Sequence, residues 1–263
     1  MRKLSVLLAL VAVLFTDFAL AAGAIVTSLT GSATVQAGTA PSRVLRQGDE
    51  VKQGEIVTTG PASAAVLRFD DGEIAALTSN SKMAVSAYQY DPQKESGNVF
   101  LSLLSGGMRA VTGLIGRRTP NNVAYRAATA TVGIRGTDIM VVTDGVEVAV
   151  SVNDGVISVT INGQTLTITA GQAIFSKPGS APVSGPTNQV LGQAPQIFGD
   201  AIAQSNALTV AIQQSGGNTG TGTTGQGTGN QGTGTNGGAQ GSGGTGSGGG
   251  AGGGGSSGTA SPS

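Results

Sequence analysis

The chain has 263 residues, with 14 basic and 14 acidic side chains, no histidine and no cysteine. The lack of cysteine excludes a disulfide framework and a thiol nucleophile, and the lack of histidine removes the commonest general base and zinc ligand. The balanced charge gives no electrostatic reason to bind nucleic acid or an anionic membrane surface.

Residues 1–22 have the pattern of a secretory signal peptide. Arg2 and Lys3 precede an apolar run that is too short to span a bilayer, and Ala19-Leu20-Ala21 fits the small-residue cleavage site. An uncleaved anchor is the alternative, and Asp17 argues against it. No later run reaches membrane length, so we expect a periplasmic or extracellular protein without stable membrane insertion after removal of the signal.

Residues 23–176 are rich in Val, Thr, Ala, Gly and Ser and carry turn signals at short spacing, which predicts one all-β domain. Asp70-Asp71-Gly72 has the composition of a hairpin turn, and residues 117–122 should form an exposed loop. The predicted strands up to this loop are, in chain order, 25–26, 33–35, 56–59, 64–69, 73–77, 83–90, 99–104 and 108–115.

The end of this region has the clearest pattern of alternation. Valines alternate with other residues over 146–152, Asn153-Asp154-Gly155 forms a predicted turn, and Asn162-Gly163 forms a second turn before a last strand near 166–168. This meander predicts a single antiparallel sandwich or roll. A β-solenoid-like coil also has short strands between turns, so it stays open as an alternative.

The chain changes character after residue 176. Four prolines make 177–195 a predicted linker, and residues 196–214 could form a short helix with one apolar face. Residues 215–263 are almost entirely Gly, Ser, Thr, Gln and Asn, a composition that cannot bury enough apolar surface to fold and so predicts a disordered tail.

The stretch 127–142 is strand-like but holds Arg135 between Gly133 and Gly136. Glycines inside a strand pattern indicate a bulge or a close backbone approach. Arg135 could offer its guanidinium to an anionic ligand or a partner's carboxylate. The interpretation we favour is a bidentate pair with Asp138, Asp70 or Asp71 that fixes the bend, because an unpaired buried charge is costly.

The sequence gives little support for catalysis. No Gly-x-Ser-x-Gly elbow precedes a helix in the predicted domain, and the carboxylate pairs Asp49/Glu50 and Asp70/Asp71 are sequence neighbours on turns, which seldom face each other across a cleft. Asp70 to Glu73 also lacks the spacing of a calcium loop. We therefore expect no enzyme, no metal site and no cofactor. Tyr88, Tyr90 and Tyr125 are expected to pack in the core or at an edge.

Several ordered segments resemble the FecR-domain family. The signature-like run is Val132-Gly133-Ile134-Arg135-Gly136-Thr137-Asp138, which also brings Thr137 and Asp138 into the candidate motif. Upstream, Leu104 to Arg109 is similar to the family's G-x-x-R strand. The other similar segments are Gln47 to Val51, Val57 to Ala64, and Leu67 to Gly72.

The resemblance implies a non-catalytic, all-β extracytoplasmic domain. The family's namesake is a membrane-spanning sensor, whereas this chain has no membrane-length run after residue 22, so we expect a secreted, stand-alone member. We expect it to contact an envelope protein or glycan through its β-surface. The alternatives are a matrix or surface protein with a Gly-rich tether, a regulator linked to iron uptake, and last a hydrolase. The candidate interaction or structural residues are Arg135, Thr137, Asp138, Asp70, Asp71 and Arg109.

Overall fold

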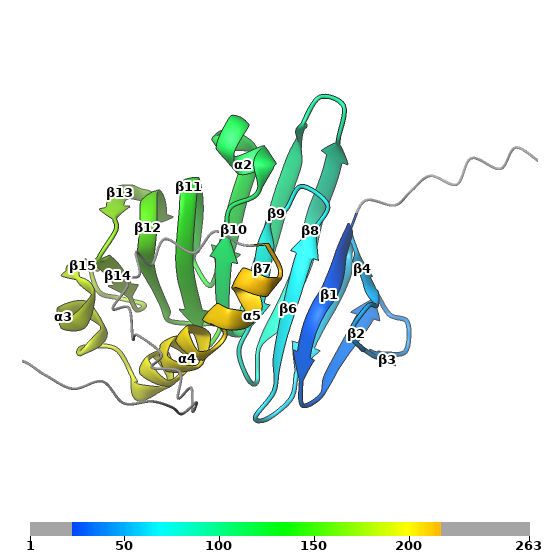
Figure 1. The fold of residues 1–263 in the computed structure, drawn as a ribbon. Helices are drawn as coiled ribbons and strands as arrows, with labels where there is room; N and C mark the ends of the chain where they lie inside the picture. Colours follow the sequence, from blue (N-terminus) through cyan, green and yellow to red (C-terminus); the bar gives the residue numbers. More distant parts are fainter. Residues whose placement is uncertain (1–22, 217–263) are drawn as a thin grey trace, which may run out of the picture. The chain divides into compact units, whose positions relative to one another are not determined.

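The computed structural model describes residues 23–216, so the predicted signal peptide and all but the first two residues of the predicted tail lie outside the described residues (Figure 1). Its strands join in one sheet, and every pairing is antiparallel except the parallel pair of β9 and β10. The prediction of an all-β sandwich or roll is confirmed, and the alternative of a β-solenoid-like coil is wrong. The strands are β1 (Gly23–Thr30), β2 (Ala33–Ala37), β3 (Arg43–Val44), β4 (Glu50–Lys52), β5 (Glu55–Thr59), β6 (Ala64–Phe69), β7 (Ile74–Leu77), β8 (Lys82–Asp91), β9 (Ser96–Val111), β10 (Val123–Ala127), β11 (Ala130–Thr143), β12 (Val148–Ile161), β13 (Gln164–Thr169), β14 (Gln172–Ser176) and β15 (Val183–Pro186).

Two hairpin turns form where the sequence predicts them. Gly72 has φ +83° and its N–H donates to the carbonyl oxygen of Phe69, which closes the β6–β7 turn. Asn162 and Gly163 have φ +51° and +79° between β12 and β13, as two-residue hairpin loops require. The local sequence therefore determines the positions of both turns.

Two other predicted breaks are wrong, because the chain continues through them as bulged strand. The strand expected to end at Gly106-Gly107 runs on as β9, and the turn expected at Asn153 to Gly155 lies inside β12. Gly106, Gly136 of β11 and Gly155 have φ +86°, +61° and +84°. The positive φ that marks a turn also permits a bulge, and the partner strands decide between them.

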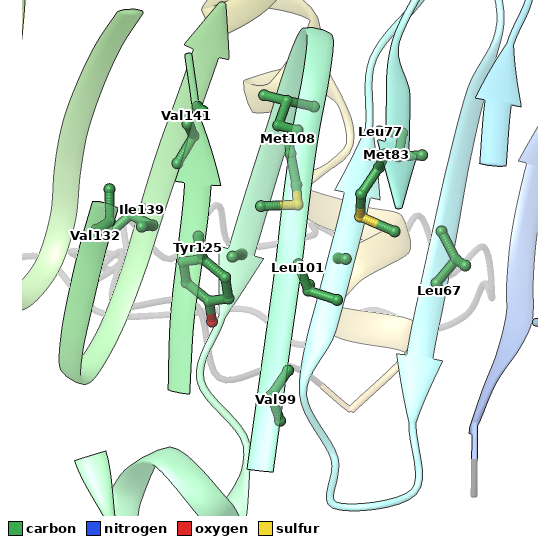
Figure 2. Close-up of a cluster of buried hydrophobic side chains, with 14 of the residues drawn as sticks. Leu67, Leu77, Met83, Val99, Leu101, Met108, Tyr125, Val132, Ile139 and Val141 are labelled. Carbon is green, nitrogen blue, oxygen red and sulfur yellow. The ribbon is translucent and has the colours of Figure 1, made fainter. Parts of the chain in front are cut away.

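Each bulge changes which residues face the main core. In β9 the inward residues are Val99, Leu101 and Leu103 before Gly106 but Met108 and Ala110 after it. Figure 2 shows Leu101 and Met108 among the buried side chains of this core. Without the extra residue, the second half of β9 would turn its apolar side chains outward. The same change of parity occurs in β11, from Val132 and Ile134 to Ile139 and Val141, and in β12, from Val148, Val150 and Val152 to Ile157, Val159 and Ile161.

The helices that follow β15 cover part of the opposite, outer face of the sheet, whereas the short helix after β9 places Ile115 in the main core. The helices are α2 (Leu114–Arg118), the 3-10 turn η1 (Pro120–Asn122), α3 (Thr187–Leu191), α4 (Gln196–Ala207) and α5 (Thr209–Gln214). α4 buries Phe198 against Phe175, with ring centroids 5.7 Å apart, and α5 buries Ile212 in a second small cluster with Val111. Apolar contact with the sheet explains why a segment of weak intrinsic helicity folds here. None of the helices in the described range is long and apolar enough to cross a membrane.

The C-terminal region departs from the prediction in detail. The segment expected to be one helix over 196–214 is two, with the break at Leu208. The expected linker 177–195 contains β15, which pairs with β14, and then α3. The prolines flank these elements instead of preventing them, since Pro186 ends β15 and Pro195 precedes α4. Similarly, the strand expected to reach 115 ends at Val111, and α2 follows.

Candidate interaction site

Arg135 is exposed, so the favoured prediction of an internal ion pair is wrong. The carboxylate of Asp138 pairs with Arg109 instead. The physical reason is the bulge between Arg135 and Asp138, which keeps both side chains on the outer face but separates them into two environments. The helices cover Asp138, whereas Arg135 lies on the part of that face that remains open.

The Arg109–Asp138 pair is bidentate and buried. Arg109 Nε donates to Asp138 Oδ1 at 2.8 Å and Nη2 donates to Oδ2 at 2.6 Å, and each side chain is only 2% exposed. Arg109 Nη1 donates to the hydroxyl of Thr209 in α5 at 3.0 Å, and Asn153 Nδ2 donates to Asp138 Oδ1 at 3.3 Å. Because each guanidinium nitrogen and both carboxylate oxygens are hydrogen-bonded within the protein, this pair joins β9, β11, β12 and α5 and is a structural element, not a free ligand site.

Thr137 holds the bulge in place. Its N–H donates to Thr112 Oγ1 at 2.8 Å, and its carbonyl oxygen accepts from the N–H of Thr112 at 2.9 Å. The two threonine hydroxyls also lie 3.0 Å apart. Gly155 approaches from β12 so closely that a Cβ there would lie 2.2 Å from the carbonyl oxygen of Gly136. The bulges of β11 and β12 are therefore packed against each other, and the backbone that presents Arg135 is rigidly supported.

An open groove of about 410 Å³ runs beside Arg135 on the outer face. Val156, opposite Arg135 in the β11–β12 register, is 39% exposed and contributes apolar surface. The groove thus combines one cation with small and apolar surface. Its full lining is Pro120, Asn121, Gly133, Ile134, Arg135, Val156, Ile157, Ser158 and Thr167.

Asp70 and Asp71, the two acidic candidates in the β6–β7 hairpin, differ in burial and in their hydrogen-bond partners. Asp70 is exposed, and its Oδ2 accepts a hydrogen bond from the N–H of Gly23 at 3.1 Å. Asp71 is buried, and its carboxylate accepts from the N–H groups of Glu73 and Ile115 at 3.2 Å and 3.3 Å. The structure therefore does not bring Asp70 or Asp71 to Arg135, and each supports the local fold of the hairpin.

Asp71 belongs to a buried polar cluster that the sequence did not reveal. Tyr88 donates its hydroxyl to Asp71 Oδ1 at 3.3 Å, and Tyr125 donates to Glu73 Oε1 at 3.1 Å. Glu73 is fully buried, and its Oε2 has no hydrogen-bond partner within the described residues. Residues far apart in the sequence meet here, so Glu73 carries no local signal of burial. The tyrosines pack in the core, as expected.

Burial controls the ionisation of this cluster. It raises the pKa of Asp71, while the hydrogen bonds from Glu73 and Ile115 act in the opposite direction. Burial also raises the pKa of Glu73 well above its ordinary value, and the neighbouring charge of Asp71 adds to this. A neutral Glu73 carboxyl follows, because an ionised form would be a buried charge with one oxygen unpaired. Over residues 23–216, no three Asp, Glu, His or Cys side chains come together as a metal cluster.

Comparison with known proteins gives one family match. Residues 55–158, from β5 to near the end of β12, match the family described as FecR protein. No curated protein matches the chain. Crystal structures at 1.65 Å and 2.50 Å resolution of a "putative anti-sigma factor" from Parabacteroides distasonis are weakly similar, with 13% and 14% identity and TM-scores of 0.40 and 0.42. Each match covers 50% of this chain and 59% of the other, so this chain spans less than two thirds of those proteins.

The matched range contains the bulged strand with Arg135, the Arg109–Asp138 pair and the β6–β7 hairpin. These are most of the segments on which the sequence resemblance rests, and only Gln47 to Val51 lies outside the matched range. Residues 55–158 of this chain therefore match the FecR family, and the resemblance to that family is confirmed.

Proposed function

We propose that this chain is a non-catalytic interaction protein of the cell envelope that binds an extended, acidic segment of another protein at the Arg135 groove. The guanidinium of Arg135 receives a carboxylate of that segment, and Val156 contacts an apolar side chain beside it. The envelope location in this proposal rests on the signal-peptide pattern of residues 1–22 and on the FecR domain.

The observation that carries the proposal is the contrast between the two arginines of the motifs. Arg109 is buried and its guanidinium is occupied by Asp138 and Thr209. Arg135 is exposed, and it makes no ion pair within residues 23–216. Because packed bulges hold the backbone at Arg135, binding of a carboxylate by the unpaired guanidinium costs little backbone freedom.

The composition of the groove favours a protein ligand over a glycan. Sugar rings usually stack on aromatic side chains in their binding sites, and no aromatic residue lines this groove. A peptide needs hydrogen-bonding partners and room for its side chains, which the hydroxyls of Ser158 and Thr167 and the bare Cα of Gly133 can provide.

The test is site-specific photocrosslinking in the full chain, expressed in its own cells. A benzophenone amino acid at Val156 should yield a discrete adduct with one protein. Arg135→Ala in the same chain should reduce the adduct at least several-fold, and Arg135→Lys should reduce it less because the charge remains. The matched control is Arg126→Ala, because Arg126 is also exposed, on the neighbouring strand β10.

Three results bear on the proposal. A protein adduct that depends on Arg135 and not on Arg126 supports it. An adduct unaffected by Arg135→Ala would refute the role of the guanidinium. An adduct that resists protease but is broken down by glycan-degrading enzymes would replace the protein partner with a glycan.

A further inference from the structure

Strand β13 is the least protected edge of the sheet. It pairs with β12 on one side and with no strand of residues 23–216 on the other, and it lies at the margin of the sheet in Figure 1. Its six residues, Gln164–Thr169, include no charge and no proline. Free strand edges normally carry such features because they prevent unwanted pairing with another chain.

Three other edge strands within the described residues do carry these protections. β3 has two residues, one of them Arg43, and β4 has three, with exposed Glu50 and Lys52. β15 ends at Pro186 and is followed directly by α3. The absence of protection at β13 therefore distinguishes it from these three edge strands.

The backbone of β13 has groups available for pairing. The N–H of Ala170 donates to the carbonyl oxygen of Gly155, so in this antiparallel register the even-numbered residues bond toward β12. The N–H and C=O groups of Thr165 and Thr167 consequently point away from the sheet. The N–H of Thr169 is already occupied by Gln172 Oε1 at 3.2 Å.

We propose that β13 pairs antiparallel with β13 of a second copy of this chain, about a two-fold axis at Thr167. In this register Thr167 lies opposite the partner's Thr167, and Thr165 lies opposite the partner's Thr169. All threonines then share the outer face, and Leu166 meets the partner's Ile168 on the core face. Such Thr–Thr and aliphatic pairs stabilise antiparallel strands, and no like charges oppose each other.

The pairing has a consequence for the outer face. Thr167 also lines the Arg135 groove, so a β13–β13 contact places the grooves of two copies on one continuous sheet. The inference goes beyond the proposed function and does not depend on it, because the edge would pair whether or not the groove binds a ligand.

The first experiment uses cysteine crosslinking, for which the chain has no background because it contains no cysteine. Opposed residues of a hydrogen-bonded antiparallel pair have Cα atoms about 5.5 Å apart, within disulfide range. Thr167→Cys should therefore form a disulfide-linked dimer under mild oxidation. Thr165→Cys is the matched control: it is exposed on the same strand, but its counterpart lies four positions away across the axis. Equal crosslinking of both variants, or none, would overturn the proposal.

The second experiment uses charge complementation in solution. The full chain after signal removal should show a concentration-dependent dimer by sedimentation velocity. Thr167→Lys and Thr167→Glu should each be monomeric because like charges meet at the axis, and an equimolar mixture should recover the dimer. Both substitutions are on an exposed edge, and circular dichroism checks that the variants fold. A wild-type chain that stays monomeric, or a mixture that does not recover the dimer, would overturn the proposal.

Discussion

Asp138→Asn tests whether the Arg109–Asp138 pair holds the outer face together. The substitution keeps the size of the side chain but removes its charge and replaces an acceptor oxygen with an NH₂ group. Arg109 donates to the two Asp138 oxygens at 2.8 Å and 2.6 Å. In the variant, the NH₂ group would replace one of these oxygens and face an N–H of Arg109, so that hydrogen bond would be lost. The guanidinium of Arg109, only 2% exposed, would lose its counter-charge.

The expected cost follows from this burial. Breaking a buried ion pair by removing one partner costs about 3 to 5 kcal/mol, because the remaining charge is uncompensated. For a folded region of about 190 residues, an unfolding entropy of about 2 cal/mol/K per residue converts that loss to roughly 8 to 12 °C in the unfolding midpoint.

The assay is thermal unfolding followed by circular dichroism. Asp91→Asn provides the matched control, because Asp91 pairs with Lys94 at 3.0 Å on the surface and should contribute little to the midpoint. Replacing both partners, Arg109→Met with Asp138→Leu, should recover part of the loss, since no charge is then left buried. If Asp138→Asn shifts the midpoint no further than Asp91→Asn, the buried pair does not have the role assigned to it.

Two further predictions concern the polar cluster and the bulges. Because the pKa of Glu73 in the folded protein lies above its ordinary value of 4.5, the folded state holds a proton that the unfolded chain releases, and stability falls as the pH rises above about 4.5. Glu73→Gln should flatten this slope and increase stability at pH 8 relative to pH 5, as measured by urea unfolding at both values; an unchanged slope would contradict a neutral Glu73. Gly155→Ala should destabilise by more than about 1 kcal/mol, because φ is +84° and the new Cβ would meet the Gly136 carbonyl oxygen at 2.2 Å. Gly163→Ala, with φ +79° and nothing within 4 Å, is its control, and an equal loss in thermal unfolding would show that packing between the bulges is not what matters.

The sequence was most informative where short-range chemistry decides the structure. Asp70-Asp71-Gly72 and Asn162-Gly163 are turns because their residues tolerate positive φ between two alternating strands. The glycines around Arg135 also indicate a bulge from the sequence alone. These features depend on a few neighbouring residues, so the pattern contains the information needed to find them.

The sequence was less informative where a distant partner decides. Gly155 follows Asn153 and Asp154 in a typical turn composition, but β11 pairs with β12 on both sides of it, and the strand continues. The residues around Asp138 do not indicate that it pairs with Arg109, which is 29 positions away, and not with Arg135, which is three positions away. In the sequence, Glu73 looks like any polar residue beside a hairpin turn. It is buried because Tyr125 and α2, which come from distant parts of the chain, pack around it.

The bulge of β11 connects the structural and the proposed interacting parts of this domain. Arg135 and Asp138 are separated by an odd number of positions, so in a regular strand they would point to opposite faces of the sheet. The extra residue at the bulge places both on the outer face while the apolar residues on either side keep facing the core. Asp138 then meets Arg109 under α5, and Arg135 remains in the open groove next to β13. One inserted residue thus divides the outer face into a part that is buried under α5 and a part that stays exposed around Arg135. The exposed part extends to β13, the edge at which we propose that a second copy pairs.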